Sequence, residues 1–136
     1  MKALIDANVL LDVIMRRPGF FIPATAVWKA AEEQKFEALI SAISFTTIHY
    51  IVGRYSGQAA ADQSVRLIHK VFAVALVDSQ TITDAIVSGN NDFEDAVQAA
   101  SARRAGATHV VTRDFTGFSS CGLTVLSPID WRKLLV

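Results

Sequence analysis

Residues 2–12 read KALIDANVLLD, a short run of strand character followed at once by a helical pattern. Lys2 to Ile5 predicts a strand, and from Ala7 to Arg16 the apolar residues recur at the three- and four-residue spacing of a helix. A strand that runs directly into a helix is typical of parallel α/β sheets. In such sheets ligands bind beyond the carboxyl ends of the strands, which is where Asp6 stands.

The same alternation continues along the chain. Further strands are expected at residues 36–42, 72–77, 108–112 and 124–126. Helices are expected at residues 23–34, 44–55, 58–69, 81–87 and 92–105, with a final helical turn or two at 128–134. The pattern predicts an α/β protein with a mostly parallel sheet.

Composition limits the classes of protein to consider. The 136 residues carry 13 basic and 13 acidic side chains and are 51% hydrophobic, which predicts one domain over residues 1–136. The longest apolar run, residues 71–77, is far shorter than the roughly 20 residues that span a bilayer, so no membrane span is expected. Asp6 interrupts the N-terminal apolar run, so we expect no signal peptide and a cytoplasmic location. Without a basic excess, contact with nucleic acid must be local, through arginines or bound metal ions.

Four aspartates are candidates for a common site. Asp6 and Asp114 each follow a predicted strand, at the point where the chain leaves the sheet. Asp92 and Asp95 share one face at the start of the predicted helix 92–105, which a right-handed crossover would bring to the same edge of the sheet. Clustered carboxylates repel one another unless a cation neutralises them, and oxygen ligands without His or Cys favour Mg²⁺ or Mn²⁺.

Each of these aspartates also has a purely structural interpretation. Asp6 and Asp92 stand where helix N-caps are expected. Asp95 lies in a first helical turn, where the helix dipole favours an acid, and Asp114 suits a turn. The residue pattern leaves both interpretations open. The three histidines have no metal-ligand spacing and are expected in the core or at the surface.

Three sequence blocks resemble PIN domains in their order and spacing. They are residues 4–12, LIDANVLLD, residues 91–98, NDFEDAVQ, and residues 111–114, VTRD, followed by Phe118. The likeness extends over the whole chain. Within the family, the sequence is most similar to small bacterial PIN proteins with a D-F-E-D-A block, related to the toxins of VapBC-type toxin–antitoxin pairs.

This resemblance implies a fold and an activity. The fold is a three-layer α/β/α sandwich with a parallel sheet of about five strands, and the activity is metal-dependent cleavage of RNA, with Mg²⁺ or Mn²⁺ as cofactor. A cognate antitoxin protein and a homodimer are the partners that it implies, and we place the dimer contact at the helix pair between Ser44 and His69 as a hypothesis. The alternative is a catalytically weak or inactive PIN-like domain that binds RNA or protein.

The resemblance also assigns roles to residues. The expected catalytic metal ligands are Asp6, Asp95 and Asp114, with Asp92 as the extra acid of the D-F-E-D branch. Supporting hydrogen bonds are expected from Asn8 and Thr112. Separately from the resemblance, Arg113 stands beside Asp114 and is a candidate to contact the substrate phosphate, with a solvated surface position as the alternative interpretation.

One position departs from the family pattern. Thr47 stands where the family usually has an acid, early in the helix after the second strand. Threonine can orient a water or accept a hydrogen bond, but it is a poor Mg²⁺ ligand. We expect Asp92 to compensate for the missing acid. Gly117 also replaces an aspartate that often precedes the phenylalanine of the last block.

Overall fold

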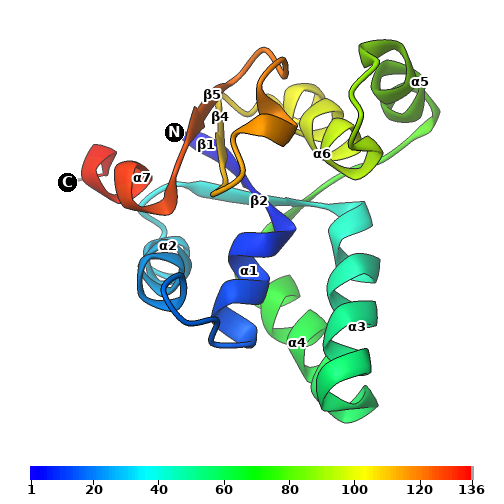
Figure 1. The fold of residues 1–136 in the computed structure, drawn as a ribbon. Helices are drawn as coiled ribbons and strands as arrows, with labels where there is room; N and C mark the ends of the chain where they lie inside the picture. The colour runs from blue at the N-terminus through cyan, green and yellow to red at the C-terminus, as the bar shows by residue number, and fades with distance from the viewer. Residues whose placement is uncertain (136) are drawn as a thin grey trace.

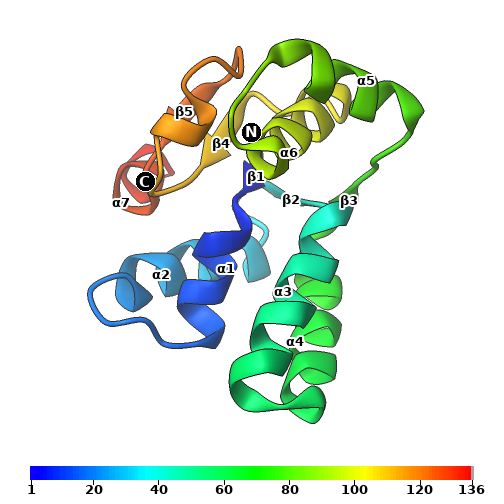
Figure 2. The same cartoon turned by 45° about the vertical axis from the view of Figure 1, so that its right-hand side comes forward.

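A five-stranded parallel sheet lies between two layers of helices in the computed structural model, which describes residues 1–135 (Figure 1). The predicted three-layer α/β/α architecture is confirmed. The helices are α1 (Ala7–Ile14), α2 (Phe21–Glu32), α3 (Ala42–Ser56), α4 (Gln58–Val71), α5 (Ser79–Ser88), α6 (Phe93–Arg104) and α7 (Pro128–Leu134), with a 3₁₀ turn η1 (Thr116–Phe118). Helices α5 and α6 cover one face of the sheet, and the other five lie on the opposite side, where α3 and α4 form a projecting hairpin (Figure 2).

The strands run in the order β3-β2-β1-β4-β5, so the first strand of the chain is the central one. Their bounds are β1 (Lys2–Ile5), β2 (Glu37–Ser41), β3 (Ala73–Ala75), β4 (His109–Val111) and β5 (Thr124–Leu126). After β1, the chain adds β2 and β3 on one side of it and then returns to add β4 and β5 on the other side. Such a reversal opens a crevice at the carboxyl ends of the two neighbouring strands, which here are β1 and β4.

The alternation of side chains along β1 explains why both faces of the sheet are covered. Ala3 and Ile5 face the layer of α1, α2 and α7, where they join a core that includes Trp131. Leu4 faces the α6 layer, where it packs with Val110 and Phe118. Successive residues of a strand point to opposite faces, so a strand buried on both sides must be apolar at every position.

Several elements differ in length from the prediction. Strand β3 covers Ala73–Ala75 rather than residues 72–77, because Phe72 ends α4 and packs edge-on against Trp28, with 5.2 Å between ring centroids. Helix α2 begins at Phe21, two residues before Pro23, because the amide of Phe21 already donates to the carbonyl of Arg17. Within residues 1–135 no helix combines the length and the apolar character needed to cross a membrane.

Candidate active site

Asp6 lies at the carboxyl end of β1 and is almost completely buried, with 1% of its surface exposed. Asp6 is the N-cap of α1, and its Oδ1 accepts a hydrogen bond from the backbone amide of Asn8 at 3.4 Å. Its Oδ2 accepts a 2.8 Å hydrogen bond from the hydroxyl of Thr112, which follows β4. The same hydroxyl accepts a hydrogen bond from the backbone amide of Asp114 at 3.0 Å. Thr112 therefore ties the ends of β1 and β4 together at the crevice.

Gln98 of α6 joins Asp6 to a second carboxylate. Its fully buried amide nitrogen lies 3.2 Å from Oδ1 of Asp6 and 3.4 Å from Oδ1 of Asp95. Its oxygen accepts hydrogen bonds from the amide of Ala7 at 3.2 Å and the hydroxyl of Ser44 at 3.3 Å. The two aspartates thus share one amide group. The sequence offered only a faint signal for this residue: a glutamine one turn after Asp95, on the same face of the helix.

Asp95 has a strongly raised pKa. Burial, followed by the negative charges of Asp6, Asp92, Asp114 and Glu94, raises its pKa from 3.8 to about 7. The pKa of Asp6 is also raised, chiefly by burial, although its hydrogen bonds from Thr112 and Gln98 act against this change. The electrostatic coupling indicates that the four aspartates chosen from the sequence, together with a fifth acid, lie in one region.

The fifth acid is Glu94, which the sequence analysis did not single out. Oε2 of Glu94 accepts a 2.8 Å hydrogen bond from the hydroxyl of Thr47. Asp92 caps α6, with Oδ1 accepting a hydrogen bond from the amide of Asp95 at 3.1 Å. That it compensates for the missing acid at position 47 stays a prediction. The carboxylate beside Thr47 therefore comes from the first turn of α6.

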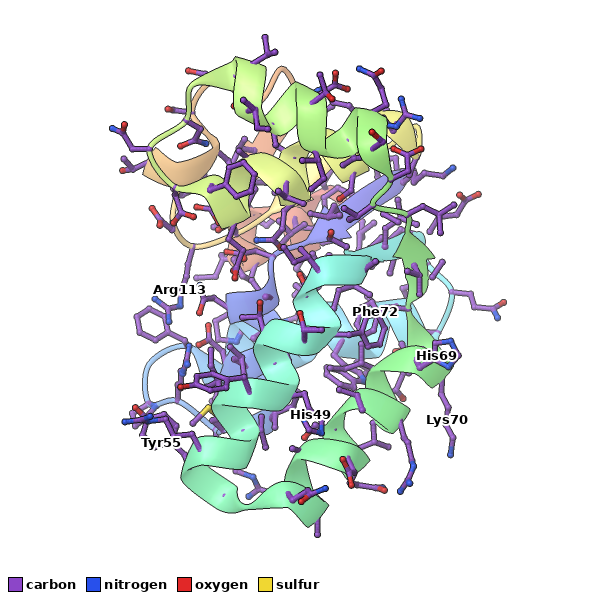
Figure 3. The ribbon with its side chains drawn as sticks, turned by 90° about the vertical axis from the view of Figure 1, so that its right-hand side faces the viewer. His49, Tyr55, His69, Lys70, Phe72 and Arg113 are labelled. Carbon is purple, nitrogen blue, oxygen red and sulfur yellow. The ribbon has the colours of Figure 1, made fainter. Side chains whose placement is uncertain are left out.

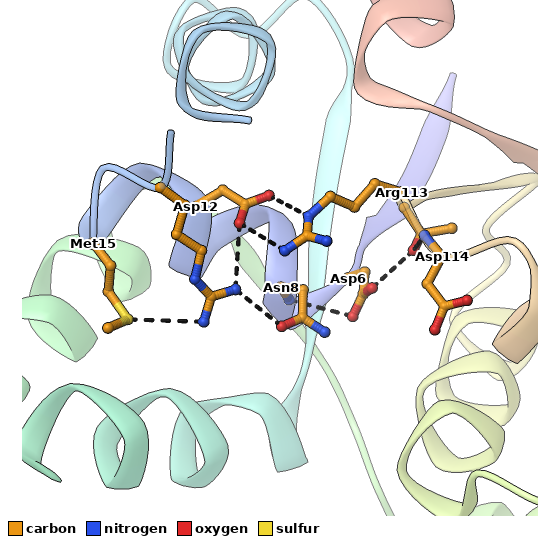
Figure 4. A network of polar contacts seen from close by, with 8 residues as sticks. Asp6, Asn8, Asp12, Met15, Arg113 and Asp114 are labelled. Atoms are coloured by element: carbon orange, nitrogen blue, oxygen red, sulfur yellow. Dashed lines mark hydrogen bonds and ion pairs between the residues drawn. The ribbon is translucent and has the colours of Figure 1, made fainter. Parts of the chain in front are cut away.

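Arg113 forms an ion pair with Asp12 of α1 (Figure 4). Its Nε and Nη2 donate to the two oxygens of Asp12, at 2.8 Å and 3.2 Å, and its guanidinium stacks 3.9 Å above the ring of Phe20. Arg17 donates to the same carboxylate and to the side-chain oxygen of Asn8, both at 3.3 Å. Asn8 therefore supports Asp6 through its backbone amide, while its side chain serves Arg17. The burial of Asp12 could not be predicted from the residue pattern.

The donor set is suited to a hard cation, although its side chains are not arranged around a single point. Within residues 1–135, no three His, Cys, Asp or Glu side chains converge closely enough to hold an ion as they stand. The causes are specific: Gln98 bridges Asp6 and Asp95, and Asp92 is engaged as a helix cap. Asp114 is exposed at the rim, where its backbone amide donates to the hydroxyl of Thr112. The oxygen ligands and their mutual repulsion still fit Mg²⁺ or Mn²⁺.

Comparison with known families decides the classification. The profile of the PIN domain matches residues 2–116. The chain belongs to the PIN-domain family. No curated protein matches the sequence significantly.

Solved structures similar to this PIN domain share its fold at low sequence identity. A toxin–antitoxin complex from Klebsiella pneumoniae has a TM-score of 0.68 and 20% identity, covering 93% of this chain and 97% of that chain. VapC20 from Mycobacterium tuberculosis, described as a sarcin-ricin loop cleaving toxin, has a TM-score of 0.73 and 17% identity, covering 90% and 96%. DNA-bound VapBC from Salmonella typhimurium has a TM-score of 0.71 and 16% identity, covering 94% and 98%.

Gly117 of the PIN domain gives Asp95 its space. A Cβ placed on Gly117 would overlap Oδ2 of Asp95, so an aspartate there would displace the carboxylate. The carbonyl of Gly117 also accepts a 2.7 Å hydrogen bond from the side chain of Asn90, which joins the turn η1 to the loop before α6. The departure from the family pattern at this position is therefore coupled to the placement of Asp95.

The three histidines of the PIN domain all contact residues outside the acidic cluster around Asp6 and Asp95. His49 lies between α3 and α4, where Nε2 is 2.7 Å from Oδ1 of Asp62 (Figure 3). The ring of His69 packs edge-on against Phe45, at 6.1 Å between centroids. His109 bonds to Thr108 at 2.7 Å. Their expected placement in the core or at the surface is confirmed.

Proposed function

We propose that this PIN domain is a metal-dependent endoribonuclease that hydrolyses RNA phosphodiester bonds at the acidic crevice between β1 and β4. The observation that carries the proposal is the pair Asp6 and Asp95, which share the amide of Gln98 and lie among three further acids. Burial of two carboxyl groups side by side costs free energy, and a functional role at this edge of the sheet would account for that cost. Perturbed carboxyl groups at the carboxyl ends of parallel strands favour a catalytic role.

The residues proposed to hold Mg²⁺ or Mn²⁺ are Asp6, Asp95 and Asp114, with Asp92 and Glu94 flanking them. A divalent cation at this point supplies a water of lowered pKa and offsets negative charge on the scissile phosphate. Loss of the proton from Asp95 gives the carboxylate form that binds a cation, and the cation in turn relieves the repulsion that raises the pKa of Asp95.

Neighbouring side chains hold the acids in position. The hydroxyl of Thr112 and the amide of Gln98 donate to different oxygens of Asp6, which fixes the plane of its carboxylate. Gln98 is itself fixed by Ala7 and Ser44. Outer partners of this kind orient metal-binding groups and commonly matter by about 10–100-fold in metal affinity or activity. We assign Arg113 to holding α1 against the loop after β4 through Asp12, with any contact to phosphate secondary.

The similar structures support a choice of substrate and partner. One is described as a sarcin-ricin loop cleaving toxin and another as a toxin–antitoxin complex, which supports RNA as substrate and an antitoxin protein as partner. We propose that this chain is the toxin of such a pair. A homodimer remains a further proposal, and a mass equal to one chain in light scattering at micromolar concentration would contradict it.

A second candidate function is a catalytically weak or inactive PIN domain that acts by binding RNA or protein. Two observations favour it: Thr47 in place of an acid, and the absence within residues 1–135 of three acids around one point. Both candidates predict some metal binding, so turnover is the measurement that separates them.

The deciding experiment is cleavage of a labelled, mixed-sequence RNA with Mn²⁺, with Mg²⁺ and with EDTA. We expect cleavage that requires the metal and is lost in Asp6→Asn and Asp95→Asn, which keep the side-chain shape and remove the charge. Asp62→Asn is the matched control, because Asp62 pairs with His49 on the α3–α4 hairpin and should leave cleavage unchanged. Intact RNA with the wild-type protein, or equal cleavage by the Asp6 and Asp95 variants, would overturn the nuclease proposal.

A further inference from the structure

A cavity of about 440 Å³ opens beside the acidic crevice. Its walls come from the loop between α5 and α6, one face of α6, and the loop around η1. Asp92 and Asp114 belong to its lining, whereas Asp6 and Asp95 do not, so the cavity borders the acids on one side and extends away from them. Its volume falls in the range of small-molecule sites, about 300–1,000 Å³.

The walls of the cavity are joined by hydrogen bonds. The side chain of Asn90 donates to the carbonyl of Gly117 at 2.7 Å, which joins the α5–α6 loop to η1. Nη1 of Arg103 donates to the carbonyl of Cys121 at 2.6 Å, which joins α6 to the end of the same loop. All four residues line the cavity. Its shape is therefore fixed across the three segments rather than left to separate loops.

The chemistry of the lining favours a neutral, polar ligand. It presents hydroxyl and amide groups, among them Ser88, Asn91 and Ser120, over a floor that includes Ala99. Arg103 is the single cation among the lining residues that the structure describes, and two aspartates oppose it. The two aspartates would repel a phosphate in this cavity. They would not repel an uncharged planar ring with hydrogen-bonding edges.

We propose that this cavity binds the base of the ribonucleotide next to the scissile phosphate and distinguishes one base from another by hydrogen bonds. The proposal rests on the proposed function, because it takes RNA as the substrate. None of the described lining residues is aromatic, so stacking, which accepts every base, is not available there. Recognition of the base edge by fixed donors and acceptors discriminates between bases, by about 10-fold or more for a well-placed pair of hydrogen bonds.

The test measures binding of the four nucleosides adenosine, cytidine, guanosine and uridine to the full chain in EDTA, by NMR titration. Nucleosides carry no phosphate and EDTA removes divalent cations, so the result does not depend on cleavage. We expect one or two nucleosides to bind at least about 10-fold more tightly than the others. Ser120→Trp, which fills the cavity, and Arg103→Gln, which removes its cation, should both weaken that binding at least 10-fold. Ser56→Trp, at the exposed end of α3, is the matched control and should bind as the wild type does.

The outcomes separate this proposal from the proposed function. Equal binding of all four nucleosides, no binding at 10 mM, or unchanged binding by a folded Ser120→Trp protein would overturn the base-binding cavity, whether or not RNA is cleaved. Selective nucleoside binding by a protein that leaves RNA intact would support the cavity and contradict the nuclease. If the wild type cleaves RNA, folded Ser120→Trp should lose its preference for the base at the cleavage position, and an unchanged preference would again overturn the cavity.

Discussion

The hydroxyl of Thr47 donates a hydrogen bond of 2.8 Å to Oε2 of Glu94, and so α3 meets the first turn of α6 at the acidic crevice. An acid on α3 and an acid on α6 can thus reach the same place from different sides. In this PIN domain the carboxylate is on α6 and the hydroxyl is on α3. The arrangement keeps a negative charge at this point while changing the residue that supplies it.

The first prediction concerns the carboxylate of Glu94 and the hydroxyl of Thr47. Glu94→Gln should lower metal-dependent cleavage about 10–100-fold, as expected for loss of a group that supports a metal site. Thr47→Val, which removes one hydrogen bond and keeps the carboxylate, should have a much smaller effect. In a Glu94→Ala protein, the additional change Thr47→Glu should recover part of the activity, measured as cleavage rate. A double variant no better than Glu94→Ala would show that the position of the acid cannot be exchanged.

The raised pKa of Asp95 predicts how stability depends on pH without metal. In the unfolded chain this carboxyl group loses its proton near pH 3.8, but in the folded protein it does so near pH 7. Between these values the folded state binds the extra proton, so stability falls as pH rises from about 4 to about 7. In EDTA, the melting temperature of the wild type should therefore fall between pH 5.5 and pH 8. We expect this fall to exceed that of Asp95→Asn over the same interval by several degrees.

The variant is needed because other groups titrate in the same interval. The lowered pKa of His109 acts in the opposite direction, because a histidine that stays neutral in the folded state makes the protein less stable as pH falls. That contribution is common to the wild type and Asp95→Asn and cancels in the comparison. Addition of Mg²⁺ at pH 8 should raise the melting temperature of the wild type more than that of the variant. Identical pH profiles for the two proteins would be inconsistent with the burial and charge around Asp95.

The close approach of Gly117 to Asp95 predicts an unusual sensitivity to one methyl group. Gly117→Ala should reduce metal-dependent cleavage at least about 10-fold and lower the free energy of unfolding by about 1–3 kcal/mol, because Asp95 or the η1 loop must move. Gly53→Ala is the control, since a Cβ there meets Ala61 Cβ at an ordinary 3.6 Å. It should leave cleavage unchanged and, within α3, should not destabilise the fold. The readouts are cleavage rate and urea denaturation.

The buried position of Asp12 predicts a structural cost for losing its charge. Asp12 is 1% exposed and pairs with Arg17 and Arg113, so Asp12→Asn should lower the free energy of unfolding by about 2–4 kcal/mol. The exposed pair of Asp130 and Lys133 offers a control, and Asp130→Asn should change stability by less than about 1 kcal/mol. Urea denaturation of both variants makes the comparison. Similar losses would mean that burial adds little to the Asp12 ion pairs.

The parts of the molecule that follow from local pattern were predictable from the sequence. The β1 to α1 segment places Asp6 at the carboxyl end of a strand by its order along the chain alone, and Asp92 shows its N-cap role by preceding a helical pattern. The same holds for the sheet, because apolar strands separated by helices pair in parallel. What could not be predicted are side-chain contacts between distant segments. Gln98 and Asp12 look like ordinary polar positions of a helix until the packed structure buries them.

Electrostatic roles were the least predictable. Arg113 next to Asp114 suggested a contact with phosphate, but Asp12, 101 residues earlier, takes its guanidinium in the structure. The contact of Glu94 could not be predicted, because its partner Thr47 is 47 residues away and lies on another helix. A charged side chain chooses its partner from everything the fold brings near it, and a single sequence does not contain that information.

The hydrogen bond between Thr112 and Asp6 spans 106 residues of chain, which has a consequence for how the protein is made. Asp6 leaves the ribosome 106 residues ahead of Thr112, and β1 has no partner on the β4 side until residues 109–111 have emerged. Contacts so distant in sequence form late and slowly. A nascent chain, or one truncated before β4, therefore carries an incomplete cluster of acids. The crevice is therefore assembled only after most of the domain has been translated.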